Sequence, residues 1–181
     1  MKHTLVARVQ DQPGVLNRVA SLFRRRAFNI ESLTVGGSET PAYSRMTIVV
    51  DTARVPAHLV AANLRKLVPV TEVRDVTHVP TVDRDLALIR VRCDPAARAE
   101  LSGLVSIFRA RIVDVGADSV IVEITGDQEK VDGLVELLRP RGIVEMVRTG
   151  KIAMVRGGSA ENGEDAEKVN GRKAENAERV S

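Results

Sequence analysis

The chain has 181 residues, of which 44% are hydrophobic and 28% charged, which is enough apolar material for one medium domain or two small ones. Its 27 basic and 24 acidic residues give a formal net charge of +3, a mixed surface and not the basic footprint of a nucleic-acid-binding protein. No apolar run approaches the roughly 18 residues that cross a bilayer, and a strand pattern follows Met1 at once. We therefore expect a cytoplasmic protein with neither a membrane segment nor a signal peptide.

The first half of the chain predicts the order strand, helix, strand, strand, helix, strand. After the turn at Asp11–Gly14 the apolar spacing changes from about two residues to about 3.6, which marks the passage from strand to helix. The predicted elements are a strand at Thr4–Val9, a helix from Val15 to near Ala27, strands at Asn29–Gly36 and Ser44–Asp51, a helix at Ala57–Leu67 and a strand at Val70–Thr77.

The same order returns in the second half of the chain. The predicted elements are a strand at Leu86–Cys93, a helix at Ala96–Arg109, strands at Arg111–Val115 and Ser119–Thr125, a helix marked by Val131, Leu134, Val135 and Leu138, and strands at Ile143–Val147 and Ile152–Val155. The fold class is therefore α+β, with two tandem βαββαβ ferredoxin-like units whose antiparallel sheets carry helices on one face.

The predicted domain boundaries follow from this repeat. Residues 1–78 form the first unit, 79–85 a linker, 86–157 the second unit, and 158–181 a charged tail whose composition is typical of disorder. A unit of about 75 residues buries only about 60% of its unfolded surface, so we expect each sheet to find further burial by pairing with another module, with oligomerisation as the default.

Most catalytic chemistry lacks candidates. The three histidines fall on different predicted elements, no glycine-rich phosphate loop is present, and no nucleophile has a neighbouring base, so neither a metal site nor catalysis is expected. Cys93 alternates with Arg90 and Arg92 on a strand, which favours a small core residue over a catalytic thiol. Domains of this order that bind RNA display aromatic residues on their central strands, and this chain offers none there.

One candidate site remains, the loop that follows the first strand. Asp11 or Gln12 can cap the next helix, Pro13 suits its first turn, and Gly14 allows a ligand to approach the backbone. The N–H groups at the start of that helix would receive a carboxylate, Asp11 would meet an ammonium group, and Asn29 would offer a donor and an acceptor. The other interpretation is a plain strand-to-helix connector, which this loop taken alone favours.

Several longer motifs, spread over roughly Met1–Gly158, resemble those of a known protein family. They resemble the small regulatory subunits of acetolactate synthase (acetohydroxyacid synthase), and within the first unit Pro-Gly-Val-Leu is typical of ACT domains in general. The resemblance is carried by Asp11–Val19, Phe28–Val35, Ser44–Ile48, Phe108–Val115, Glu123–Gly126 and Arg148–Gly150.

The resemblance implies an N-terminal ACT domain, a C-terminal ACT-like domain and a role without catalysis of its own. The partner would be a catalytic large subunit with thiamine diphosphate, magnesium and FAD, while this chain would bind no cofactor. It also implies homodimerisation through the ACT domains and feedback inhibition by valine or a related branched-chain amino acid at their interface. The alternative is a free-standing amino-acid-binding ACT regulator of another enzyme or a transcription factor.

The resemblance also places the effector site and marks one departure from the family pattern. Family members often have asparagine where this chain has Asp11. The effector-binding residues carried over by position are Asp11, Gln12, Pro13, Gly14, Val15, Leu16, Asn29 and Ile30.

Overall fold

The N-terminal domain follows the predicted order of elements. The computed structural model describes residues 1–51 and 56–157, and the tail at 158–181 for which disorder is expected lies outside them. The elements of this domain are β1 (Lys2–Gln10), α1 (Val15–Arg25), β2 (Asn29–Gly37), β3 (Tyr43–Asp51), α2 (Ala57–Arg65) and β4 (Val70–Asp75). The strands form an antiparallel sheet in the order β2-β3-β1-β4.

Alternation along the strands decides which face of this sheet is covered by the helices. Leu5, Ala7 and Val9 of β1 are buried together with Val19 and Phe23 of α1, in one apolar cluster. Burying a Val, Leu or Phe side chain contributes about 1.5–3 kcal/mol relative to exposure, so this cluster is the main source of the domain's stability. The residues between them, such as Thr4, Val6 and Arg8, face away from the helices.

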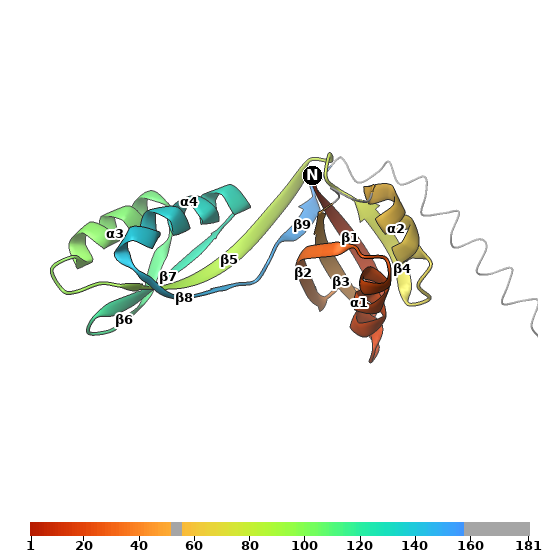
Figure 1. Ribbon diagram of the computed structural model, residues 1–181, viewed down its shortest axis with the longest axis horizontal. Coiled ribbons are helices and arrows are strands. Elements are labelled where there is room, and N and C mark those ends of the chain that lie inside the picture. Colours follow the sequence, from red (N-terminus) through yellow and green to blue (C-terminus); the bar gives the residue numbers. More distant parts are fainter. Residues whose placement is uncertain (52–55, 158–181) are drawn as a thin grey trace, which may run out of the picture.

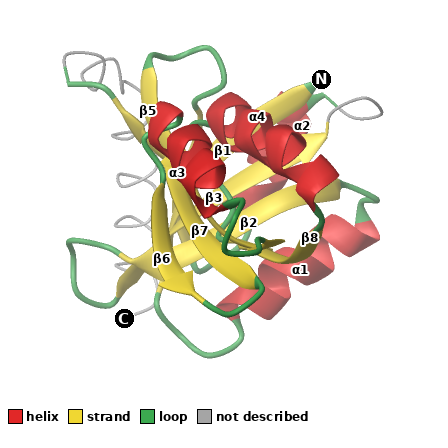
Figure 2. Ribbon diagram, turned by 90° about the vertical axis from the view of Figure 1, so that its left-hand side faces the viewer, coloured by secondary structure: helices red, strands yellow, loops and turns green. Residues whose placement is uncertain are grey.

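The C-terminal domain repeats the plan and adds one strand. Its elements are β5 (Thr81–Arg92), α3 (Arg98–Ile107), β6 (Arg111–Val115), β7 (Ser119–Gly126), α4 (Gln128–Leu138), the 3₁₀ turn η1 (Arg139–Arg141), β8 (Ile143–Arg148) and β9 (Ile152–Val155). The sheet order is β6-β7-β5-β8, and β9 pairs with the first part of β5. Helices α3 and α4 lie over one face of the sheet (Figures 1 and 2). The predicted fold class is thus confirmed for both domains.

The strand β5 differs from the sequence prediction. Residues 79–85 were expected to form a linker, but β5 begins at Thr81, and Thr81–Arg84 pair with β9. The partner strand β9 follows about 70 residues later in the chain, so the residues around Thr81 give no local pattern that predicts this pairing. The long strand β5 therefore leads directly from one domain to the other (Figure 1).

The two domains meet on the face of the N-terminal sheet that the helices leave open. Ala153 and Val155 of β9 pack there against Val6 and Val76. Figure 1 shows β9 running beside the N-terminal sheet. The second domain therefore covers part of an open sheet face, as expected for a unit too small to bury both faces by itself.

Candidate effector-binding site

The loop Asp11–Gly14 is held by backbone hydrogen bonds, and its side chains are exposed. The N–H of Asp11 donates to the carbonyl of Ala42 (2.8 Å), and the N–H of Val15 donates to that of Gln12 (3.3 Å). Gly14 has φ 86° and is the N-cap of α1. A left-handed φ favours glycine at this position, since an L side chain is strained there.

Two local predictions about this loop are wrong. Neither Asp11 nor Gln12 caps the helix, because the N-cap is Gly14 and no side chain bonds to the first turn. Pro13 precedes the helix instead of lying in its first turn. The side chain of Leu16, the second residue of α1, is 48% exposed.

The start of α1 has the chemistry of an anion site. Its first backbone bond joins the N–H of Arg18 to the carbonyl of Gly14 (3.0 Å), so the N–H groups of Leu16 and Asn17 precede the helical ladder. Among the described residues no carbonyl accepts from them, and no acidic residue occupies the first turn. Free N–H groups and the positive end of the helix dipole favour a carboxylate at this position.

Asn29 and Ile30 lie at the other end of the same sheet. Asn29 is paired with Asp51, which in turn is paired with Lys2 at the start of β1, whereas the loop follows Gln10 at its end. The nine residues of β1 separate the two sheet ends by roughly 27 Å, at about 3.4 Å per residue. The structure therefore brings Asp11–Leu16 together, but within one chain it does not bring Asn29 or Ile30 to them.

The strand β2, which carries Asn29, is also one of the two edge strands, with β4, that the described residues give the N-terminal sheet. Further along it, Ser32 accepts a hydrogen bond from the N–H of Lys151 (3.2 Å), and Thr34 donates to the carbonyl of Thr149 (3.3 Å). Gly150 lies between these contacts with φ 86°, and a Cβ there would meet the Ser32 hydroxyl at 2.5 Å. Sequence reasoning did not identify these residues as a link, although Arg148–Gly150 is one of the family-like motifs.

A mixed-charge cavity of about 370 Å³ lies where β2 meets the C-terminal domain, and Arg148 is one of the residues that line it. Its guanidinium donates to Asp132 (2.6 Å) and to Asp85 (2.9 Å from Nε). Burial would lower the pKa of Arg148, but the hydrogen bonds to Asp132 and Asp85 outweigh this and raise that pKa. Two of the three cations that line this cavity, Arg148 and Lys151, are thus already paired with acids of their own domain.

Two further kinds of chemistry-bearing group in the part of the chain that the structure describes are the thiol and the possible metal-ligating side chains. Cys93 is buried at 3% exposure, as expected for a core residue. Residues 1–51 and 56–157 contain no group of three or more His, Cys, Asp or Glu that could hold a metal ion. No helix within the same residues is long and apolar enough to span a membrane.

Known proteins match both domains. Residues 5–72 match a model of the acetohydroxyacid synthase (AHAS) small subunit-like ACT domain, and residues 84–157 match a model of the small subunit of acetolactate synthase. A probable acetolactate synthase small subunit of Archaeoglobus fulgidus is 53% identical over 157 residues, covering 87% of this chain and 98% of the relative. The chain belongs to the family of acetolactate synthase small subunits.

Other small subunits of this family are also similar to the chain in sequence and in structure. The acetolactate synthase small subunit of Bacillus subtilis is 43% identical over 87% of this chain and 92% of the relative. The crystal structure of the acetolactate synthase small subunit from Thermotoga maritima superposes with a TM-score of 0.80 at 41% identity, covering 86% of this chain and 98% of that one. The resemblance inferred from the motifs is confirmed, and the chain is a regulatory, ACT-type member of this family.

Proposed function

We propose that this chain regulates the catalytic large subunit of acetolactate synthase. It raises the activity of that subunit, which would carry out the catalysis with thiamine diphosphate, magnesium and FAD, and lowers it again when valine or a related branched-chain amino acid binds. One observation carries the proposal: the loop leads into a helix start at which no described carbonyl accepts from the N–H groups of Leu16 and Asn17, and Asn29, its expected partner, lies at the opposite end of the same sheet.

A second copy of the chain would complete the site. Within the described residues β2 is an edge strand of its sheet, and an edge strand is the element that a neighbouring strand adds to. If two copies pair through antiparallel β2 strands about a two-fold axis, Asn29 of one lies at the sheet end where the loop of the other begins. This pairing turns two separated half-sites into two whole ones.

The chemistry of each half-site suits an aliphatic amino acid. The effector's carboxylate would accept hydrogen bonds from the N–H groups of Leu16 and Asn17. Its ammonium group would lie near Asp11, whose side chain is exposed. The aliphatic side chain would pack between the exposed Leu16 of one copy and Ile30 of the second. A Leu that is 48% exposed at a helix start gains burial by this contact.

Inhibition then follows from a difference in affinity. A ligand shifts an equilibrium between two arrangements only by the difference between its affinities for them. A coupling free energy of about 1–3 kcal/mol between the effector site and the catalytic partner is typical of such systems. The contacts of Ser32 and Thr34 with residues 149–151 connect the strand of Asn29 to the second domain and offer the route for this coupling.

The first experiment mixes the chain with its candidate catalytic subunit and follows acetolactate formation while valine, leucine and isoleucine are titrated. We expect activity to rise on mixing and to fall with one of the three amino acids. No rise on mixing would overturn the proposal and favour a free-standing ACT regulator instead.

The second experiment tests the site with a matched pair of variants at Gly14. Asp and Asn tolerate its left-handed backbone about equally, and a Cβ there meets nothing within 4 Å, so Gly14→Asn is the control for Gly14→Asp. Only Asp adds a negative charge beside the effector carboxylate, at a cost of about 1–4 kcal/mol at 4 Å. We expect Gly14→Asp to weaken inhibition at least fivefold more than Gly14→Asn, with activation retained by both.

A complementation experiment tests the shared site directly. Gly14→Asp and Asn29→Ala are each expected to weaken effector binding at every site as pure variants, because each damages both sites of a dimer. In an equimolar mixture about half of the dimers are mixed, and each of these has one intact site, so about a quarter of the effector sites should return. Titration of the mixture with labelled valine measures this, and no recovered binding would contradict a site shared between two copies.

A further inference from the structure

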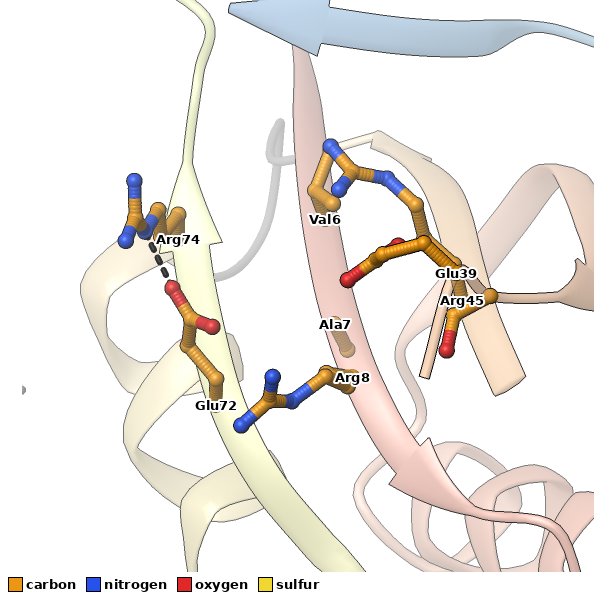
Figure 3. A pocket seen from close by; sticks show the side chains of 8 residues that line it. Val6, Ala7, Arg8, Glu39, Arg45, Glu72 and Arg74 are labelled. Atoms are coloured by element: carbon orange, nitrogen blue, oxygen red, sulfur yellow. Dashed lines mark hydrogen bonds and ion pairs between the residues drawn. The ribbon is translucent and has the colours of Figure 1, made fainter. Parts of the chain in front are cut away.

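Two arginines face each other on the open face of the N-terminal sheet. Arg8 in β1 and Arg45 in β3 are direct cross-strand partners, so both side chains project on the face away from α1 and α2. They line a cavity of about 140 Å³ together with Glu39, Glu72 and Arg74. Figure 3 shows these side chains around the hollow, with Arg45 extending toward β9 and Arg8 toward β4.

Neither Arg8 nor Arg45 has an acidic partner among the described residues. Arg8 donates weakly to the Thr71 hydroxyl (3.4 Å) and lies over the ring of Tyr43 (5.2 Å). Arg45 donates to the carbonyl of Ala153 (3.3 Å). Like charges directly opposite each other across two strands are destabilising, and both residues are only partly exposed to the water that would screen them.

Two other arginines that line cavities have an acidic partner, unlike Arg8 and Arg45. Arg74, in the same cavity, is paired with Glu72. Arg148, in the cavity between the domains, has two carboxylates. Glu39 lines the cavity of Arg8 and Arg45 but makes no ion pair with either. The cavity therefore has an uncompensated positive charge, with three arginines against two glutamates.

We propose that this cavity binds a phosphate-type oxyanion between Arg8 and Arg45. A guanidinium offers several N–H donors in a planar fork that matches phosphate oxygens, and each of these two arginines spends only one donor on protein oxygen. The cavity has room for one tetrahedral ion. Free phosphate and the phosphoryl group of a larger metabolite share this chemistry, and the site lies on the other face of the sheet from α1.

The test is a calorimetric titration of the full chain with sodium phosphate and, separately, with glycerol phosphate, at constant ionic strength set by chloride. Neutralising the pair in Arg8→Gln with Arg45→Gln should weaken binding at least tenfold. The matched control is Arg24→Gln, which removes an exposed arginine from the end of α1 and should leave binding unchanged. Tighter binding of glycerol phosphate would indicate the phosphoryl group of a metabolite, and equal binding would indicate the free ion.

A second measurement does not depend on whether the variants fold. In the wild-type chain, the side-chain Nε resonances of Arg8 and Arg45 should shift on phosphate addition, while that of Arg24 should not. Phosphate should also raise the melting temperature of the wild type and of Arg24→Gln more than that of Arg45→Gln. Absence of both the heat and the resonance shifts, or equal binding by the double variant, would overturn the proposal.

Discussion

Two glycines with the same backbone conformation allow the contribution of the contact between the domains to the free energy of unfolding to be measured. Gly14 and Gly150 both have φ 86°. A Cβ at Gly14 would meet nothing within 4 Å, whereas at Gly150 it would lie 2.5 Å from the Ser32 hydroxyl and 3.0 Å from that of Thr34. Gly14→Ala therefore measures backbone strain alone, and Gly150→Ala measures the same strain together with displacement of the β2 side chains.

The expected magnitudes can be worked out from these contacts. A left-handed backbone costs an L residue about 1–2 kcal/mol, and this is the whole expected loss in Gly14→Ala. In Gly150→Ala the side chains of Ser32 and Thr34 must move, which breaks their hydrogen bonds to Lys151 and Thr149. Each such bond contributes about 0.5–1.5 kcal/mol, so the loss should exceed that of Gly14→Ala by about 1–3 kcal/mol.

Urea unfolding of both variants, without effector and at one protein concentration, measures the difference. Hydrogen exchange should show reduced protection of β2 and β9 in Gly150→Ala and unchanged protection there in Gly14→Ala. Equal losses in unfolding free energy, with equal protection of β2, would refute the reasoning that residues 149–151 hold this strand.

Two further predictions concern charged groups. Burial would raise the pKa of Asp75, but hydrogen bonds from Thr77 outweigh this and hold that pKa below its usual 3.8. The stability that this group contributes is therefore present above about pH 4 and is lost as the pH falls through the lowered pKa. Asp75→Asn should accordingly make the free energy of unfolding in urea depend less on pH in the acid range. Arg148→Met should cost about 3 kcal/mol, because Asp85 is 6% exposed and loses its guanidinium. The exposed Arg139 provides the control, since Arg139→Met should cost clearly less in the same unfolding assay, and equal losses would contradict this account.

Most of the fold could be predicted because it depends on short-range patterns. The strands at Arg111–Val115 and Ile152–Val155 were predicted with the bounds that the structure has. Helix ends were less accurate: α2 ends at Arg65 and not at Leu67, and α3 runs only from Arg98 to Ile107. Apolar periodicity marks which residues face the core, but the last turn of a helix depends on capping that periodicity does not record.

The candidate site also has features that the sequence predicts locally and features that it does not. The loop Asp11–Gly14 is visible in sequence because turn residues and a change of period are local. Strand register is not local, so neither the separation of Asn29 from this loop nor the opposition of Arg8 and Arg45 could be predicted. The left-handed φ of Gly14 likewise appears only once the chain is placed in space.

The position of β2 explains why this fold suits regulation. One strand carries Asn29 at its start, offers an edge of its sheet to a second copy, and holds the C-terminal domain through Ser32 and Thr34. Two hydrogen bonds of about 0.5–1.5 kcal/mol each amount to about 1–3 kcal/mol, which is the range of a typical allosteric coupling. Under the proposed function, an effector that shifts β2 enough to break or strengthen these two bonds needs no other link to reach the second domain. Gly150→Ala should therefore reduce inhibition by the effector while leaving effector binding nearly intact, since the substitution lies outside the half-sites.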